Sequence, residues 1–500
     1  MSEQGIIDYW SSVKGIIDKV CKNYDNMWQK RSRLLNSQII VIMIFKIILS
    51  DRRQGLTINL ENFWDSCAEK DIKLPQKKSV SASSFCEARQ KMSEDIFKDL
   101  NKDLLENWNQ KRSLPLWLGH RVYATDGSRI NIPRELVKFG FKIYDEERRH
   151  YPQGLLSCLY DVLSKTVYDF DFVSHMNERQ CALRHLEILE PNDVVIFDRG
   201  YFSYLLLHEF HNKGVHAIFR LQEGSVNNRI KDFINSSKTD ELIDYVPSGS
   251  VISDLKKQGY FLKPVPLPLR LIKQKIKGDT YLYGTTLMGE KYPASCFSDL
   301  YHERWSIEEL YKISKRIVDI EEFHSKTERG IKQEIYAHLL LINLSRFFSF
   351  DAQDSLPPLD QQDKEKCTKI NFHKFFNPTS MFNINFKNCI IVVGRYVENL
   401  FLDGYGEIKN WATKVIQMIL RGRTAIEDRE SRIMPDNARY MTEDEIGRTI
   451  IKTAAAKKWA CSHDAPNNLK CQLLTRGHQA SINIHYTKKE IGRASCRERV

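Results

Sequence analysis

The spacing of apolar residues divides the chain into a helical N-terminal part and a following part built from strands and helices. Before residue 116, apolar residues recur at helical spacing in three stretches, which are 6–21, 31–49 and 87–108. From Arg121 the pattern alternates between apolar and polar positions as in a strand, and this stretch ends at Pro133. We therefore predict a helical domain over residues 1–115, with an α/β fold after it.

The second part contains three predicted strands followed by a strand–helix–strand unit. These segments are residues 121–132, 155–163, 166–173, 193–197, 202–212 and 216–221. The dipeptide Ser164-Lys165 is typical of a hairpin turn, and the run DVVIF at 193–197 is continuously apolar, as in a strand covered on both faces. This order indicates a ribonuclease-H-like sheet, although other α/β folds share parts of it.

Further along the chain, we expect a β-rich insertion into this core at about residues 222–290, which hold short strands, turns and basic residues. Helices are predicted after it, at about 297–320 and 331–348. Residues 490–500, EIGRASCRERV, read like the translation of a common sequencing-adapter oligonucleotide, so we leave them out of fold reasoning. The predicted parts are a helical domain at 1–115, the α/β ribonuclease-H-like core at 116–350, a linker at 351–375, a mainly helical C-terminal region at 376–489 and the artefact at 490–500.

Composition narrows the class of protein. The 500 residues are 42% hydrophobic and 28% charged, which is ordinary for a soluble globular protein. The net charge of +11 suits a polyanionic partner, and basic loops in the helical domain suit contact with DNA, but an ordinary basic protein would share this charge. The 11 cysteines form no framework and no signal peptide opens the chain, so we expect a reducing cytoplasm. The longest apolar run, 38–50, is too short to cross a membrane.

Two aspartates stand out in the predicted strands. Asp126, in YATDGS, lies in mid-strand, where a charge is costly unless a partner compensates it, and Gly127 leaves space beside it. Asp198, in VVIFDRGY, follows an apolar strand at its C-terminal end, where open α/β sheets place their ligands. For each aspartate the alternative is a structural role in capping the next turn.

A stripe of polar residues follows on the predicted helix at 297–320. Its members share one narrow face because their separations of three, four and seven residues match the helical repeat, and they are Tyr301, Arg304, Glu308 and Lys315. Leu310 and Ile313 point the other way and can pack on the sheet, so we expect the stripe to face a groove or solvent. A solvated face with an Arg304–Glu308 pair is the alternative.

These residue types suit cleavage of a DNA phosphodiester. That reaction needs a nucleophile near neutral pH and shielding of developing charge, and two divalent ions provide both. Mg²⁺ prefers carboxylate oxygens, which Asp126, Asp198 and Glu308 would offer, and Mn²⁺ would serve similarly. Arg304 and Lys315 are then placed to hold phosphates, while Tyr301 can donate a hydrogen bond.

The pattern Y-(2)-R-(3)-E-(6)-K resembles the signature of the IS4-type DDE transposases, and the segments ATDGS, DRGY, TTL and HSKTERGIKQEIYAHLL are similar to that family as well. The likeness covers about residues 80–350. It implies that Asp126, Asp198 and Glu308 form a catalytic, metal-binding triad on a ribonuclease-H-like fold. It also implies binding of terminal inverted repeats and target DNA, a dimeric synapse, cut-and-paste movement, and action in the bacterial cytoplasm.

Two other functions stay open at this stage. A nuclease on the same fold would cut DNA without joining it, and a catalytically inactive DNA-binding protein would act as a regulator. A zinc site at Cys461, His463, Cys471 and His478 is disfavoured because the spacing lacks a close ligand pair. We interpret Asp161, Asp169 and Asp171 as solvated residues of the hairpin, and we expect Trp305 to pack at a domain edge rather than to stack on a base.

Overall fold

The computed structural model describes most of the chain, and its residues fall into two compact units. The first comprises 1–358 and 373–424, and the second 359–372 and 425–500. Within these, the described residues are 3–29, 34–50, 54–144, 150–222, 227–276, 279–358, 380, 382–403, 407–425, 448, 450–451, 460–465, 468–475, 478–485 and 495–499. Most of the predicted linker therefore lies outside the described residues.

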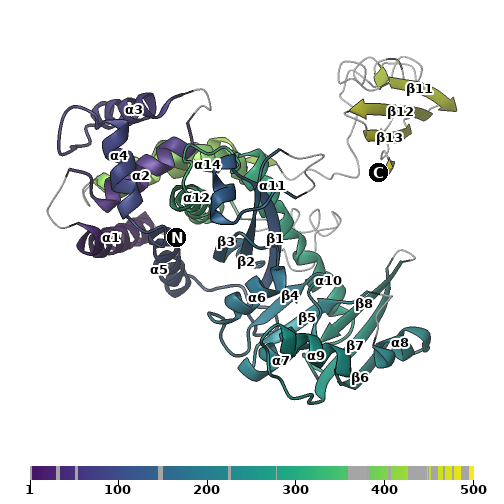
Figure 1. The fold of residues 1–500 in the computed structure, drawn as a ribbon. Helices are drawn as coiled ribbons and strands as arrows, with labels where there is room; N and C mark the ends of the chain where they lie inside the picture. Colours follow the sequence, from purple (N-terminus) through teal and green to yellow (C-terminus); the bar gives the residue numbers. More distant parts are fainter. Residues whose placement is uncertain are drawn as a thin grey trace. The chain divides into compact units, whose positions relative to one another are not determined.

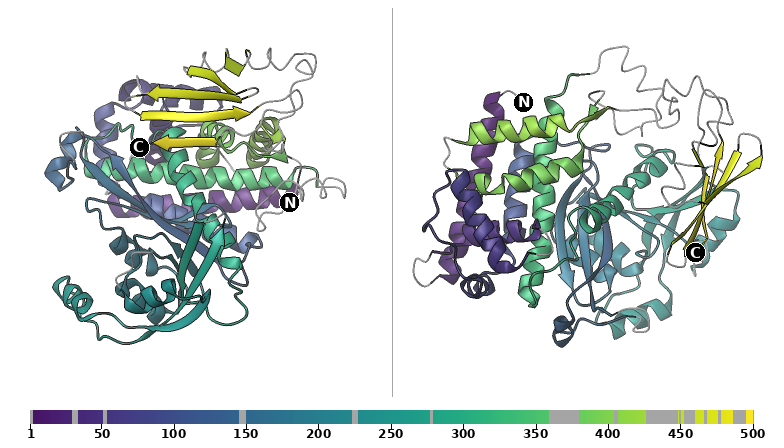
Figure 2. Two further views of the ribbon diagram at one scale, coloured as in Figure 1. Left: turned by 90° about the vertical axis from the view of Figure 1, so that its right-hand side faces the viewer. Right: turned by 90° about the horizontal axis from the view of Figure 1, so that it is seen from above.

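The N-terminal helices surround one long helix from later in the chain. They are α1 (Glu3–Trp28), α2 (Ser37–Ile48), α3 (Leu56–Glu69), α4 (Ala82–Lys91) and α5 (Ile96–Lys111). The long helix α12 (Glu328–Asp354) packs against α2 and α5 and against the later helices α14 and α16 (Figures 1 and 2). Trp10 stacks on Phe348 with ring centroids 3.6 Å apart, which joins α1 to α12. The helix predicted at 87–108 is two helices, and α3 was not predicted.

A sheet of eight strands forms the centre of the first unit, in the order β3-β2-β1-β4-β5-β8-β7-β6. The core strands are β1 (Val122–Asn131), β2 (Gln153–Asp161), β3 (Thr166–Val173), β4 (Val194–Phe197) and β5 (His216–Arg220). Strands β1 to β3 are antiparallel, whereas β4 runs parallel to β1 and β5 parallel to β4. This is the ribonuclease-H-like order, and the predicted fold class is confirmed.

The insertion extends this sheet beyond β5. Strand β8 (Asp279–Thr285) pairs antiparallel with β5, and β7 (Leu267–Ile276) and β6 (Asp240–Tyr245) follow outward. Strands β7 and β8 form a hairpin, which fits the β-rich insertion predicted here. Helices α8 (Asn228–Asn235) and α9 (Gly249–Lys257) were not predicted.

Helices carry the chain across the sheet. Helix α6 (Glu178–Leu186) leads into β4, and α7 (Tyr204–Lys213) leads into β5 after a cap at Gly214, whose φ is 70°. The single helix predicted at 297–320 breaks at Arg304 into α10 (Cys296–Glu303) and α11 (Trp305–Arg316). Helix α11 packs against β1.

The rest of the first unit is mainly helical, but the prediction of a mainly helical region over 376–489 is wrong for its later part, where the described residues from 460 to 485 form strands. Its elements are β9 (Phe382–Asn383), α14 (Phe386–Arg395), α15 (Val397–Leu402) and α16 (Ile408–Arg421), and the unit ends within β10 (Thr424–Ala425). No helix among the described residues is long and apolar enough to span a membrane.

The second unit holds an antiparallel sheet of β11 (Ala460–Ala465), β12 (Asn468–Thr475), β13 (His478–His485) and β14 (Ser495–Arg499). Cys461 and Cys471 face each other across β11 and β12 and form a disulfide. With both sulfurs in that bond, neither cysteine offers a thiolate to a zinc ion.

Candidate active site

The two strand aspartates lie at the same level on neighbouring strands. Ala124 of β1 pairs in parallel with Ile196 of β4, so Asp126 and Asp198, each two residues further on, are side by side. Neighbouring strands are about 4.8 Å apart, and residues in register point to the same face. The opening strand and the fourth strand therefore bring the two carboxyl groups together.

Asp126 is held in a largely buried position. Its Oδ1 accepts the Gly127 amide at 2.9 Å, and its Oδ2 lies 3.9 Å from Nη1 of Arg304. Burial raises the pKa of Asp126 to about 6; the Gly127 amide and Arg304 oppose that rise, whereas Glu178 and Asp198 add to it. Its charge is thus only partly compensated.

Asp198 is better compensated. Its Oδ1 accepts a hydrogen bond of 3.0 Å from the Tyr301 hydroxyl. Burial alone would raise its pKa, but the Arg199 amide, the Arg304 guanidinium and the Tyr301 hydrogen bond together hold it below its usual value. This aspartate is therefore the more readily ionised of the two.

Arg304 is the common neighbour of the three acids. Its Nη2 lies 2.6 Å from Oε1 of Glu308, one helical turn further along α11. Burial would lower the pKa of Arg304, but Tyr301, Asp198, Glu308 and Asp126 raise it. We call Asp126, Asp198 and Glu308, grouped around this guanidinium, the acidic cluster.

The predicted stripe is only partly exposed. Tyr301 and Arg304 are 4% and 6% exposed, so the expectation that the whole stripe faces a groove or solvent is wrong. They are buried because they reach over the sheet to the two aspartates. Lys315 is more open, and its Nζ donates to the backbone oxygen of Arg129 on β1 at 2.7 Å. The structure does not bring Lys315 to the acidic cluster.

Several residues at the site were not singled out in the sequence. The Tyr311 hydroxyl donates to the backbone oxygen of Asp126 at 2.7 Å, which fastens α11 to β1. Glu178, at the start of α6, lies against Gly127, and Tyr201 of the DRGY segment is buried beside it. Glu178 looked like an ordinary acid in a first helical turn. Trp305 is 56% exposed, so the expectation that it packs at a domain edge is wrong.

The acidic cluster suits a divalent cation by its donor chemistry, but it is not closed around one. Among the described residues, no three His, Cys, Asp or Glu side chains lie close enough to hold a metal as they stand. Instead the Arg304 guanidinium provides the positive charge between Asp126 and Glu308. Carboxylate oxygens are the ligands that Mg²⁺ and Mn²⁺ prefer.

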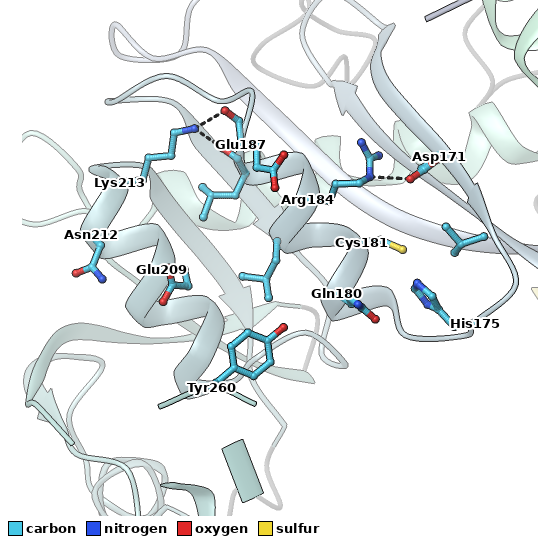
Figure 3. A pocket seen from close by; sticks show the side chains of 13 residues that line it. Asp171, His175, Gln180, Cys181, Arg184, Glu187, Glu209, Asn212, Lys213 and Tyr260 are labelled. Atoms are coloured by element: carbon cyan, nitrogen blue, oxygen red, sulfur yellow. Dashed lines mark hydrogen bonds and ion pairs between the residues drawn. The ribbon is translucent and has the colours of Figure 1, made fainter. Parts of the chain in front are cut away.

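A second set of charges lies on the same sheet, and Figure 3 shows part of it. His185 is 1% exposed, and its Nδ1 lies 2.6 Å from Asp169 Oδ2 while its Nε2 lies 3.0 Å from Ser157 Oγ. Arg184 bridges to Asp169 at 3.1 Å and to Asp171 at 2.8 Å. We call Asp169, Asp171, Arg184 and His185 the clamp cluster, because they fasten α6 to β2 and β3.

The clamp cluster corrects one interpretation of the sequence. Asp169 and Asp171 are paired beneath α6 rather than solvated. Asp161 is also buried, at 4% exposed, and its Oδ1 caps the hairpin by accepting the amides of Leu163 and Ser164. The three aspartates have structural partners.

Comparison with known proteins identifies this sheet and its helices. Residues 117–344 match the family described as Transposase DDE domain, and the match includes all six residues proposed from the sequence. These residues are therefore similar to that family, and we call the matched stretch, which runs from just before β1 into α12, the DDE domain.

Two curated transposases are similar to the chain. Transposase InsG for insertion sequence element IS4 of Escherichia coli (strain K12) is 24% identical over 287 residues, which cover 55% of this chain and 63% of that protein. The transposase for insertion sequence element IS231F of Bacillus thuringiensis subsp. israelensis is 23% identical over 248 residues, covering 41% and 52%. The chain thus spans less than two thirds of the length of either relative. The resemblance to IS4-type transposases is confirmed.

A solved structure, the piggyBac transposase synaptic complex with hairpin DNA, aligns with a TM-score of 0.37 at 10% identity. The alignment covers 83% of this chain and 85% of that one. The fold assignment of the DDE domain rests on its own strand order.

Proposed function

We propose that the chain is an insertion-sequence transposase that cleaves DNA at the element's ends and joins the freed 3′-OH to target DNA. The observation that carries this proposal is the grouping of three acids from β1, the end of β4 and α11 around one arginine, within a DDE domain. Acids so distant in the chain gain nothing structural from meeting, because like charges repel and burial adds a cost.

In this proposal Asp126, Asp198 and Glu308 hold divalent cations, Mg²⁺ or Mn²⁺ and two in number. Bound cations supply an activated water at neutral pH and neutralise charge on the phosphate. Tyr301 orients the Asp198 carboxylate through its hydrogen bond of 3.0 Å. Arg304, released from Glu308, is then free to hold a phosphate oxygen with its two-pronged guanidinium.

The proposed partners are double-stranded DNA, as terminal inverted repeats and target, and a second copy of the chain in a dimeric synapse. The net charge of +11 favours binding to DNA. Lys315 is the most accessible cation of the stripe, and we assign it to a backbone phosphate of the DNA. The proposed place of action is the bacterial cytoplasm.

The test uses supercoiled DNA that carries the two ends of the parent element, incubated with the full chain and Mg²⁺. Gel separation distinguishes excised linear element from joined product, and omission of Mg²⁺ with excess chelator is the first control. Glu309→Ala is the matched protein control, because Glu309 is the exposed neighbour of Glu308 and lies outside the acidic cluster.

We expect excision and joining with the native chain and with Glu309→Ala. Cleavage without joined product would replace the proposal by a nuclease. Binding of the ends without cleavage, in Mg²⁺ and in Mn²⁺, would replace it by a DNA-binding regulator. Sizing of the DNA complex tests the dimer separately, since a synapse holds two chains on two ends.

A further inference from the structure

A cavity of about 490 Å³ lies where the N-terminal helices α2 and α3 meet α14 and the segment 317–324 that follows α11. Its described lining includes no residue of the acidic cluster. Cavities of about 300–1,000 Å³ with mainly apolar walls and a few polar groups are typical of small-molecule sites. The volume therefore suits a ligand of the size of a nucleotide.

Asn59 of α3 lines this cavity with an unsatisfied side-chain amide. The residue is only 4% exposed, and among the described residues neither its Nδ2 nor its Oδ1 has a hydrogen-bond partner. Asn62, one turn further along α3, differs, because its amide donates to Gln54 Oε1 at 3.2 Å. Buried polar groups nearly always have a partner, so this amide indicates a position that a ligand completes.

His324 contributes a second unpaired group to the same lining. Its backbone amide donates to Glu334 Oε2 on α12 at 2.9 Å, which fixes the residue in place. Its Nδ1 is out of contact with solvent and has no hydrogen-bond partner in the part of the chain that the structure describes. An amide and an imidazole nitrogen thus line one cavity, and both are unsatisfied.

The other walls include apolar side chains that suit a flat ring, among them Leu49, Phe63 and Ile391. Phe63 is 1% exposed, whereas Ile391 is 42% exposed and lies toward solvent. Insertion of an aromatic ring between such side chains is favourable, because it removes apolar surface from water. The cavity therefore combines walls for a ring with hydrogen-bonding groups for its edge.

The charged residues of the cavity differ in how far they are compensated within the protein. Lys46 is 3.0 Å from Glu398 Oε1, so its charge is balanced. Asp319 and Glu322 also line the cavity, and each has a contact of its own. Arg395 of α14 is exposed, which makes its guanidinium accessible to an anion such as a phosphate.

These groups define the ligand by its chemistry. A side-chain amide offers a donor and an acceptor side by side, and adenine presents the matching pair at N6 and N7. We propose that the cavity binds an adenine nucleotide, whose base pairs with Asn59 between the apolar walls and whose phosphate meets Arg395. His324 provides a further hydrogen bond to the base or its ribose.

Two sources supply this chemistry, which are a free nucleotide and an unpaired adenosine of a DNA strand. In either case the ligand would join α3 to the segment that directly follows α11, and so would link the N-terminal helices to the helix that carries Glu308. The inference goes beyond the proposed function, since the cavity shares no described residue with the acidic cluster.

The test measures binding of radiolabelled AMP to the full chain by equilibrium dialysis, without metal ions. Asn59→Asp keeps the size of the side chain but replaces the amide by a carboxylate, which only accepts. We expect it to weaken AMP binding by about tenfold or more, the scale of one bidentate pair with a base. Asn228→Asp makes the same change at an exposed position on α8 and should leave binding within about twofold.

A second variant keeps the test decisive if Asn59→Asp fails to fold. Arg395 is exposed, so Arg395→Ala should leave thermal unfolding unchanged. It should weaken binding of AMP but not of adenosine, which lacks the phosphate. GMP is the matched ligand control and should bind the native chain at least about tenfold more weakly than AMP.

Two oligonucleotides distinguish the sources, one with a single adenine among thymines and one of thymines alone. A preference for the first that is lost in Asn59→Asp assigns the cavity to DNA, whereas AMP binding without such a preference assigns it to a free nucleotide. Equal binding of AMP and GMP would overturn the inference, as would the absence of any binding that depends on Asn59 or Arg395. Cleavage by the acidic cluster is measured separately, so the proposed function would stand.

Discussion

The acidic cluster and the clamp cluster lie on the same sheet, yet their charges balance differently. In the clamp cluster each carboxylate has cationic or hydrogen-bonding partners, since Asp169 meets His185 and Arg184, and Asp171 meets Arg184 and Lys98. Burial would raise the pKa of Asp169, but these partners bring it far below its usual value. This cluster is complete without any ligand.

The carboxylates of the acidic cluster, in contrast, have too few cationic partners to balance their charge. Asp126 and Glu308 share the Arg304 guanidinium, and burial leaves the pKa of Asp126 at about 6. A balanced buried network stabilises a fold, whereas an excess of one charge is retained where a ligand of the opposite charge binds. The comparison thus separates a cluster whose charges are balanced from one whose charges are not, without reference to sequence motifs.

The largest expected effect is on catalysis. Asp126→Ala, Asp198→Ala or Glu308→Ala should each reduce end cleavage in Mg²⁺ by at least about a thousandfold, the scale on which removal of one member of a catalytic unit acts. Binding of the DNA ends should persist, as measured by gel shift. Any of the three variants that cleaves at the rate of Glu309→Ala would remove that residue from the proposed triad.

A substitution in the clamp cluster should instead lower the stability of the fold. Asp169→Asn leaves His185 and Arg184 without their shared anion, and breaking a buried pair in this way costs about 3–5 kcal/mol of unfolding free energy. Urea unfolding measures this. Asp254→Asn, which breaks the exposed pair with Lys257 on α9, is the control and should cost at most about 1 kcal/mol. Equal losses in the two variants would contradict a structural role for the clamp cluster.

The pH dependence of stability should sharpen the comparison. Because burial raises the pKa of Asp126 from its ordinary value of 3.8 to about 6 in the folded protein, the folded protein retains this proton to a higher pH. Its favourable contribution is complete below about pH 4 and is lost as the pH rises through 6. At about 1.36 kcal/mol per pKa unit, the loss is about 3 kcal/mol in metal-free protein.

Asp126→Asn removes this titration and provides the measurement. The native chain should lose about 3 kcal/mol of unfolding free energy relative to this variant between pH 4 and pH 7. Asp169→Asn should show no such gain at neutral pH, because the native Asp169 is stabilised as an anion. A constant difference between native chain and Asp126→Asn across this range would contradict an uncompensated charge at Asp126.

The sequence predicted the core strands well, because they depend on local pattern, and the three acids stay a prediction drawn from the same pattern. Alternation and apolar runs identify β1 and β4, and each aspartate stands out against them. Which residues cover a face of the sheet depends on contacts between segments that are distant in the sequence. The alternation of apolar and polar residues in β3 indicates a strand with its polar side chains in solvent. In the structure, Arg184 and His185 of α6 cover Asp169 and Asp171.

The same limit applies to the helix stripe and to the insertion. Helical spacing shows that Tyr301 and Arg304 share a face, but not that this face reaches over the sheet to the aspartates. The helical spacing also did not predict the turn at Arg304, which divides α10 from α11. Strands of the insertion were recognised, while their pairing with β5 depends on partners far away in the chain.

The smallest expected effect concerns Lys315, which lies outside both clusters. Its ammonium group donates to the Arg129 backbone and is 3.8 Å from Glu321, so it is already neutralised in part. Lys315→Ala should therefore weaken binding of the DNA ends only a few-fold and reduce the slope of log affinity against log salt by about one. Fluorescence anisotropy over a salt series measures both. Lys257→Ala, an exposed lysine on α9, is the control, and an equal change in slope for the two variants would mean that Lys315 contributes only general charge rather than a phosphate contact.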